Sequence, residues 1–451
     1  MTTPIGSLLS LPTTDRHQVP RLAVGIVIPG FEKEKEMKKK DPQITAGLAS
    51  NRRSFLKKGV AAAGAATMGV GLLNSPARAL AAGEFGNGRI NRGDAAILRF
   101  LQALETIEAD IWRQYAELGG AGANTPGTTG NSPIDLFFQG KPIPTALAPL
   151  YIAGLQQLDA DMPQYIDDNT DDELSHMSFL AAYLESKGEP IADLTKFYDI
   201  TPSQVPGVPN TGRLTNLTQL TVDTSWWTRY RSDSKNPDLG DTFDNAIPTL
   251  AVGQHTAIPR TNQDLSADPN QPGGVSVHTQ AIANTAGFHF AWIEQGGSSL
   301  YPQLAQRVTN VEVLRVLLSI GPSEVAHFQT WHDKAGNAIQ LTDTDTGFPG
   351  STGATVTFPN LNDPAHTAAQ ADELQTNLIM PEPTFFLNKK FGPVSIIRPT
   401  ETKNAATAAL QSFIDDGLFI GHTSKSGKSD GFVELLRELA ADADEARREI
   451  E

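Results

Sequence analysis

Two short elements of the chain place a glutamate three residues before a histidine, and each follows a stretch with an isolated glutamate among apolar residues. The elements are Glu173-x-x-His176 and Glu324-x-x-His327, and the isolated glutamates are Glu105 and Glu294. Positions three apart share one face of a helix, so the carboxylate and the imidazole of each element can point at one metal ion. The repeated order indicates a metal site built from oxygen and nitrogen ligands.

An aromatic residue follows each isolated glutamate at the same distance. Trp112 lies seven residues after Glu105, and Tyr301 lies seven residues after Glu294. Seven residues make about two helical turns, so each ring is expected on the helix face of its glutamate. A single Glu-x-x-His element arises often by chance, but two that each follow a matched pair indicate one site assembled from two similar halves.

Glu108 competes with Glu105 for the ligand position in the first half. The apolar stripe of this stretch runs through Glu108, whereas the alignment of the halves sets Glu108 against Gly297 and favours Glu105. We therefore predict Glu105 as the ligand and Glu108 as a neighbour of the site, beside the two aromatic residues. The plainer alternative is that these glutamates are exposed on their helices, as most glutamates are.

Two helical regions are expected to carry the first half of the site. Apolar residues at alternating steps of four and three predict a helix over 94–118, with Asp94 as its N-cap. A second helical region over about 146–187 contains Pro163, which predicts an interruption there and a new start near residue 170.

Two further helices are expected to carry the second half. The patterns predict them from about 279 to 295 or 301 and from about 311 to 334. Pro322 lies inside the last helix, two residues before Glu324, and predicts a kink or a new segment there. Four long helices and little strand pattern predict an all-α fold with a four-helix bundle over 94–335.

A long connection separates the second helix from the third. Residues 191–277 are dense in Pro, Asn, Thr and Asp. A segment of this length must be partly ordered, and Trp226, Trp227 and Tyr230 are expected to pin it to the bundle.

Residues 336–451 are expected to form an irregular C-terminal extension. A short strand is predicted at 355–358, and helices are predicted over about 404–416 and 432–451. No complete chemical motif stands out in this extension. We expect it to cover the bundle or to mediate assembly.

Four other residues carry ion-binding chemistry in incomplete patterns. Asp343 and Asp345 have the alternate spacing that begins a Ca²⁺ loop, but no glycine or later glutamate completes it, so a solvated turn is expected. His289 and His332 are expected to pack near the site rather than to bind the metal.

Composition limits the partners and the ligands. The chain has 451 residues and a net charge of −15, and no basic surface stands out that would neutralise nucleic-acid phosphates. It has no cysteine, which excludes disulfides, thiolate ligands and cysteine nucleophiles. A metal ion would therefore have oxygen and nitrogen ligands, which suit iron or manganese better than structural zinc.

Residues 1–81 read as a leader and signal peptide rather than as part of the fold. The stretch 51–57 (Asn-Arg-Arg-Ser-Phe-Leu-Lys) resembles the twin-arginine export motif, and an apolar run over 59–73 follows it. Small residues around Ala79 offer possible cleavage sites. The run is short for a membrane span, so we expect a periplasmic or secreted protein exported by the twin-arginine route.

The bundle residues resemble the ferritin-like superfamily, and in particular its exported bacterial and fungal members, which include desiccation-related proteins. The segments that carry the resemblance are 104–112 (Leu-Glu-Thr-Ile-Glu-Ala-Asp-Ile-Trp), 172–176 (Asp-Glu-Leu-Ser-His), 288–294 (Phe-His-Phe-Ala-Trp-Ile-Glu) with Tyr301, and 324–327 (Glu-Val-Ala-His). The resemblance covers about residues 94–190 and 279–335. It implies a ferritin-like four-helix bundle in which a long crossover joins the second and third helices.

The resemblance also implies a ligand set for two metal ions. Its six members would be Glu105, Glu173, His176, Glu294, Glu324 and His327. Glu173 and Glu324 would bridge the two ions, and each histidine would bind one of them. Glu105 and Glu294 would be terminal ligands. Trp112 departs from the resemblance, because such proteins often have a tyrosine at that position.

Together these observations predict an exported protein with two Fe ions, or alternatively two Mn ions, and redox chemistry on O₂, peroxide or Fe²⁺. Whether it is an enzyme stays open, because the alternative is a structural or stress-protective protein whose site binds metal weakly or not at all. The expected partners are metal ions and a small oxidant, with no nucleic acid and, after signal cleavage, no membrane. We expect a monomer or a small homo-oligomer.

Overall fold

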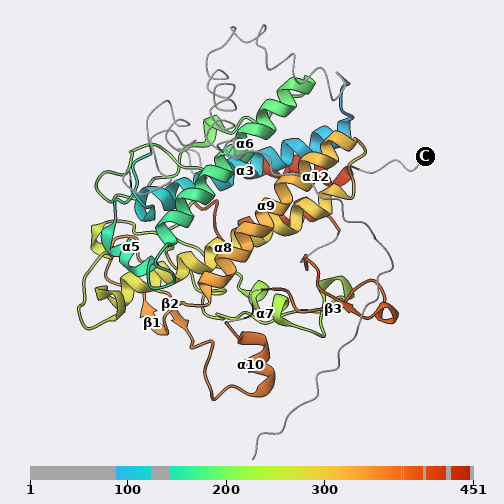
Figure 1. Ribbon diagram of the computed structural model, residues 1–451. Coiled ribbons are helices and arrows are strands. Elements are labelled where there is room, and N and C mark those ends of the chain that lie inside the picture. The colour runs from blue at the N-terminus through green and yellow to red at the C-terminus, as the bar shows by residue number, and fades with distance from the viewer. Residues whose placement is uncertain are drawn as a thin grey trace, which may run out of the picture. The chain divides into compact units, whose positions relative to one another are not determined.

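The computed structural model describes residues 88–122, 143–376, 378, 380–399, 403–422 and 428–446. The expected leader and signal peptide, residues 1–81, lie outside the described residues. Within the described ranges the chain is helix-rich, with nine α-helices and only short strands (Figure 1). This agrees with the all-α prediction.

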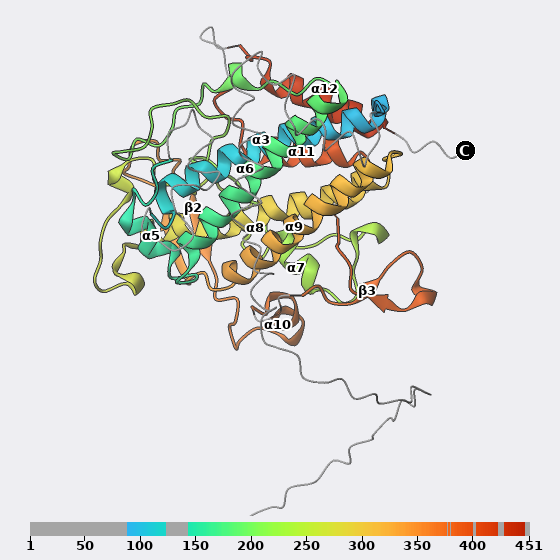
Figure 2. The same ribbon diagram turned by 45° about the horizontal axis from the view of Figure 1, so that its top comes forward.

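Four long helices run through the molecule as two neighbouring pairs. They are α3 (Arg92–Gly119), α6 (Met162–Lys187), α8 (Val277–Ala305) and α9 (Val311–Ala335). Helix α3 packs mainly on α6, and α8 packs mainly on α9. The two members of each pair run in opposite directions, as the views in Figures 1 and 2 both show.

The second long helix begins earlier than the sequence predicted. Pro163 does not interrupt it, and the expected new start near residue 170 is wrong, because α6 begins at Met162. A proline in the first turn removes only an N–H that has no helical partner there, and its fixed φ suits a helix start. The preceding part of the region is a separate short helix, α5 (Pro149–Leu155).

The N-cap of the first long helix is Asn91 rather than Asp94. The side chain of Asn91 accepts a hydrogen bond from the backbone N–H of Asp94 at 2.8 Å. The Asp94 carboxylate instead accepts the backbone N–H groups of Thr309 and Asn310, at 2.9 and 2.8 Å. Because Asn310 is the N-cap of α9, Asp94 ties the starting ends of α3 and α9 together.

Pro322 does not start a new segment, because α9 continues through it as one helix. The proline leaves the carbonyl of Leu318 without its helical N–H partner. The side chain of Leu318 is 56% exposed, so this carbonyl lies on the side of the helix that water can reach.

The long crossover is ordered and is pinned as expected. It contains α7 (Ser225–Arg231) and short 3₁₀ turns at Thr195–Phe197, Pro237–Leu239, Asn262–Asp264 and Pro272–Gly274. Trp226, Trp227 and Tyr230 are buried. The ring of Trp226 lies 6.1 Å from that of Phe288 on α8 and 5.8 Å from that of Phe328 on α9, measured between centroids.

The C-terminal extension is part of the same hydrophobic core as the long helices. Its elements are β1 (Leu341–Thr344), β2 (Thr355–Phe358), α10 (Ala368–Leu374), β3 (Thr384–Phe385), a 3₁₀ turn at Lys389–Phe391, β4 (Pro393–Val394), α11 (Ala405–Asp415) and α12 (Phe432–Glu445). Strands β1 and β2 pair antiparallel, as do β3 and β4. Helix α12 packs on α3, and α11 packs on α8 (Figure 2). The extension therefore covers the long helices.

The expected solvated turn at Asp343 and Asp345 is wrong. Asp345 is fully buried, and its carboxylate lies 2.7 Å from a guanidinium nitrogen of Arg260. Asp343 contacts His255 and His278. The sequence pattern missed both roles because the partners lie in the crossover and at the start of α8, far away along the chain.

Candidate metal centre

The four glutamates of the repeated pattern lie near the middle of the four long helices and face one another. Glu105, Glu173, Glu294 and Glu324 are each at most 2% exposed, which excludes the alternative of exposed helix glutamates. Helix α8 is buried almost all round, because α5, α9, α11 and β1 all pack on it. Its glutamate therefore has no outer face to occupy.

The structure brings all six sequence-predicted ligands together in two overlapping groups. The first contains Glu105, Glu173, His176 and Glu324, and the second contains Glu173, Glu294, Glu324 and His327. Within each group the possible ligand atoms all lie within 4.8 Å of one another. Glu173 and Glu324 belong to both groups. These are the two residues that the resemblance would make bridging ligands.

Each histidine turns its Nδ1 atom toward the carboxylates. Nδ1 of His176 lies 3.2 Å from an oxygen of Glu173 and 3.0 Å from one of Glu324. Nδ1 of His327 lies 3.1 Å from oxygens of both Glu173 and Glu294. The two imidazoles therefore contact different oxygens of Glu173, and their ring centroids lie 6.1 Å apart.

The outer nitrogen of each histidine also has a partner. Nε2 of His176 lies 3.1 Å from the hydroxyl of Ser323, and Nε2 of His327 lies 3.1 Å from a carboxylate oxygen of Asp172. Such contacts fix the ring orientation and the tautomer of a metal-binding histidine. Ser323 directly precedes Glu324, and Asp172 directly precedes Glu173. Each histidine is therefore contacted by a residue next to the other Glu-x-x-His element.

A buried asparagine that the sequence reasoning missed holds two of the glutamates in place. The amide nitrogen of Asn169 donates to Glu173 at 3.0 Å and to Glu294 at 2.9 Å. The indole N–H of Trp331 donates to the amide oxygen of Asn169 at 2.7 Å. The available signal was the spacing, because Asn169 lies four residues before Glu173 and therefore shares its helix face.

The two matched aromatic residues have different roles. The hydroxyl of Tyr301 donates a hydrogen bond to Glu105, so this phenol lies directly against the cluster. The ring of Trp112 stacks on Phe290 and on Trp331, with centroids 5.0 and 5.1 Å apart. Trp112 therefore packs behind Trp331, whose indole N–H donates to Asn169.

Glu108 and Gly297, which correspond in the two halves, both adjoin the cluster. Glu108 is buried but belongs to neither group of ligands. A Cβ atom at Gly297 would lie 2.4 Å from a carboxylate oxygen of Glu324. The glycine therefore provides the space in which Glu324 sits. Both residues line one pocket, together with Trp292 and Leu300.

With all four glutamates ionised, the cluster would hold more negative charge than its two histidines could balance. No lysine or arginine of the described residues forms an ion pair with its four glutamates. One oxygen of Glu105 and both oxygens of Glu324 are buried and accept no well-aligned hydrogen bond, although Nδ1 of His176 faces the Glu105 oxygen at 3.4 Å and one Glu324 oxygen at 3.0 Å. Buried charge without a partner is costly, so these oxygens fit a bound cation.

The pKa values follow from burial and from the two imidazoles. Burial raises the pKa of Glu105 to about 7, and burial with the neighbouring carboxylates raises the pKa of Glu324 well above its usual range. Burial also acts to raise the pKa of Glu173, but His176 and His327 outweigh it and hold that pKa below its usual value. The protein alone thus disfavours full ionisation of the cluster.

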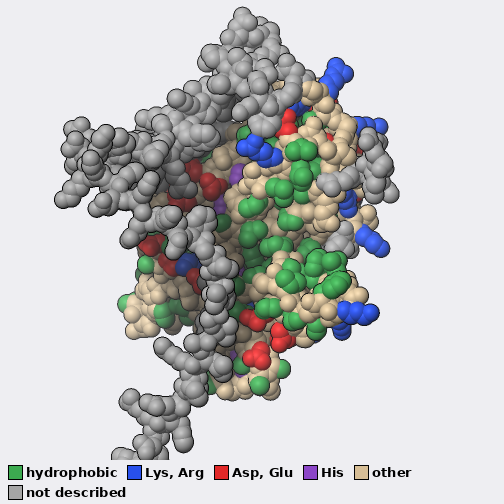
Figure 3. Space-filling model, turned by 45° about the vertical axis from the view of Figure 1, so that its right-hand side comes forward, with side chains coloured by type: hydrophobic (Ala, Val, Ile, Leu, Met, Phe, Trp, Pro, Cys, Tyr) green, Lys and Arg blue, Asp and Glu red, His purple; other side chains and the backbone are tan. Residues whose placement is uncertain are grey.

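The edge of the cluster reaches the surface at its histidines. The side chains of His176 and His327 are each 10% exposed, and Asp172 beside His327 is largely exposed. On the face drawn in Figure 3, small areas of histidine are visible beside acidic side chains.

His289 and His332 are not part of either ligand group. Nδ1 of His289 lies 2.6 Å from the hydroxyl of Tyr115. Nε2 of His332 accepts a hydrogen bond from Arg231 at 2.6 Å. Both are buried packing residues, as the sequence predicted.

Comparison of the chain with protein-family models, with curated proteins and with solved structures finds no match. The site must therefore be interpreted from its own chemistry.

Proposed function

We propose that this protein is a ferritin-like protein that holds two iron ions, or alternatively two manganese ions, between its four long helices. The single observation that carries the proposal is the pair of buried ligand groups that share Glu173 and Glu324. Four carboxylates balance the charge of two divalent ions, and one imidazole completes each side. Oxygen-rich ligand sets with imidazole suit iron and manganese.

The proposed reaction is redox chemistry on O₂, peroxide or Fe²⁺. Bound iron or manganese would supply the electron transfer. The side chains would orient the ligands: Asn169 donates hydrogen bonds to Glu173 and Glu294, and the hydroxyl of Tyr301 donates one to Glu105. The pocket between Glu108 and Gly297 would admit a small oxidant or an incoming ion, because its wall at Gly297 lies against Glu324.

We further propose that the protein is exported by the twin-arginine route and acts in the periplasm or outside the cell. The support is the arginine pair and the apolar run in residues 51–73. Among the described residues no helix is both long and apolar enough to cross a membrane. The proposed partners are metal ions and a small oxidant, and the proposed assembly is a monomer or a small homo-oligomer.

Elemental analysis of the purified mature protein tests the metal proposal. We expect about two Fe or Mn ions per chain, before or after anaerobic loading with Fe²⁺ or Mn²⁺. The double variant Glu173→Ala with Glu324→Ala removes two ligands from each group and is expected to lose both ions while keeping its helical circular dichroism. Glu185→Ala, an exposed position on the same helix as Glu173, is the control and should keep both.

Two outcomes would count against the proposal. Full metal content in the double variant would mean that the ions bind elsewhere. No metal in the native protein, even after loading, would favour the structural or stress-protective alternative.

A further inference from the structure

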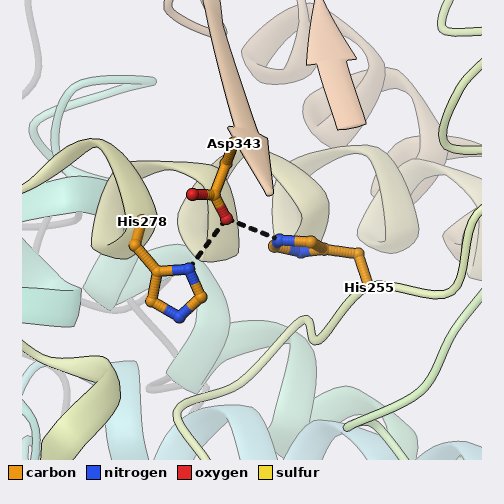
Figure 4. A group of neighbouring side chains, drawn as sticks. All are labelled: His255, His278 and Asp343. Carbon is orange, nitrogen blue, oxygen red and sulfur yellow. Dashed lines mark hydrogen bonds and ion pairs between the residues drawn. The ribbon is translucent and has the colours of Figure 1, made fainter. Parts of the chain in front are cut away.

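A second group of histidine and carboxylate side chains lies near the start of α8. Its members are His255 from the crossover, His278 from the first turn of α8 and Asp343 from β1 (Figure 4). One oxygen of Asp343 lies 2.8 Å from Nδ1 of His278 and 3.2 Å from Nε2 of His255. His278 precedes Glu294 by sixteen residues on α8, so this group is about 24 Å away along the helix.

The outer ring nitrogens of both histidines face acceptors. Nε2 of His278 lies 3.2 Å from a carboxylate oxygen of Asp264. Nδ1 of His255 lies 2.9 Å from the backbone carbonyl of Thr256. With the N–H held at the outer nitrogen by its acceptor, the lone pair of the inner nitrogen would be available to an ion bound beside the carboxylate of Asp343. This is the arrangement by which proteins orient metal-binding histidines.

The charges around the group leave room for one divalent cation. Asp264 and Asp345 both pair with Arg260, at 2.8 and 2.7 Å. Three carboxylates, including Asp343, therefore face one guanidinium, and all of these side chains are at most 10% exposed. With both histidines neutral the excess is two negative charges, which a single divalent ion would balance.

The group is largely enclosed by the protein. His255 is fully buried. The ring of Phe348 stacks on His278 with 4.0 Å between centroids and 8° between planes, which covers one side of the group. The three ligands come from three separate parts of the chain, so an ion here would fasten the crossover and the C-terminal extension to α8.

We propose that His255, His278 and Asp343 bind one Zn²⁺ ion, independently of the two ions proposed between the long helices. Two imidazoles and one carboxylate are an established type of ligand set for zinc, with a fourth position for water. The proposal does not rest on the function proposed above, because the two sites share no residue.

Zinc counting in a background without the bundle site tests this directly. The mature chain with Glu173→Ala and Glu324→Ala is stripped with a chelator, dialysed against Zn²⁺ and analysed for zinc per chain. We expect about one zinc ion in this background and less than about a tenth of one after Asp343→Asn or His278→Gln. His422→Gln is the control, because His422 is also buried and paired with an aspartate, Asp430, but has one carboxylate only.

Zinc K-edge absorption spectroscopy of the same background protein identifies the ligands and does not depend on how the variants fold. Two imidazole nitrogens in the zinc shell would support the proposal. A background protein that binds no zinc, or folded Asp343→Asn and His278→Gln proteins that keep it, would show that the group is only a hydrogen-bonded histidine and carboxylate network. A zinc shell without two imidazoles would overturn the assignment as well.

Discussion

The two halves of the proposed metal centre are built from equivalent positions but are supported by different side chains. In each half an isolated glutamate and a Glu-x-x-His element come from neighbouring helices, and both halves share Glu173 and Glu324. Asp172, which precedes the first Glu-x-x-His element, contacts His327 of the second. Ser323, which precedes the second element, contacts His176 of the first. The ligands therefore repeat, whereas their environment does not.

The half that contains Glu294 and His327 is held by more hydrogen bonds. Asn169 donates to its terminal glutamate, Trp331 orients Asn169, and a carboxylate faces the outer nitrogen of His327. A carboxylate partner raises the basicity of a metal-binding histidine. We expect this half to bind its ion more tightly.

The half that contains Glu105 and His176 is held by fewer hydrogen bonds, and the pocket lined by Glu108 lies beside its helix, α3. One oxygen of Glu105 faces Nδ1 of His176 at 3.4 Å, and the other accepts the phenol hydroxyl of Tyr301. Glu108 and the pocket lie on the same side of α3 as Glu105, toward α8. We expect an ion held by this half to exchange more readily.

The largest loss of bound metal from a single substitution is expected at Gly297. Gly297→Ala places a methyl group on a carboxylate oxygen of Glu324, and that glutamate serves both halves. The carboxylate can swing away because it ends a flexible side chain, so the protein should fold but bind less than about one ion per chain in place of about two. Elemental analysis after dialysis measures this change.

The adjacent glycine provides the control for that substitution. Gly296 has no heavy atom within 4 Å of its missing Cβ, so Gly296→Ala should keep both ions. It should also raise the free energy of unfolding by up to about 1 kcal/mol, since alanine is the better helix former. Equal metal content in the two variants would show that Glu324 does not need the space at Gly297.

The next largest effect distinguishes the two glutamates of the first helix. Glu105→Ala removes a ligand from one half only, so we expect the metal content to fall from about two ions to about one. Glu108→Ala should keep both ions, because Glu108 belongs to neither ligand group. The reverse ranking would make Glu108 the ligand and would place the first ion nearer to the pocket.

The repeat in the sequence was enough to select the six clustered residues and the helices that carry them. Spacing within a helix is local, so Glu173 and His176 share a face wherever α6 lies. The alignment of the two halves also favoured Glu105 over Glu108. Gly297 corresponds to Glu108 in that alignment, and it is a glycine because Glu324 occupies the space that a side chain would need.

What the sequence did not reveal depends on contacts between distant segments. Asn169 is an ordinary polar residue on its own helix, and its role follows only from the approach of Glu294 and Trp331. The group at His255, His278 and Asp343 joins three segments whose order along the chain carries no repeat. The start of α6 was missed for a different reason, because a proline is a helix breaker in the interior but a good first-turn residue.

The smallest expected change in metal binding tests whether the two halves hold their ions with different affinities. Asn169→Ala removes the donor shared by Glu173 and Glu294 while leaving every ligand in place. Loss of such an outer contact typically weakens metal binding about 10- to 100-fold, and here the larger loss should fall on the half with His327, because Glu294 belongs to that half alone. The corresponding change in the other half is Tyr301→Phe, which removes only the hydrogen bond to Glu105.

Competition with a graded series of chelators measures the two metal affinities separately. In the native protein we expect one tightly bound and one more weakly bound ion. In Asn169→Ala we expect two ions of similar affinity, and in Tyr301→Phe a larger difference between the two affinities. Two equal affinities in the native protein would mean that the different surroundings of the halves do not set how tightly each ion is held.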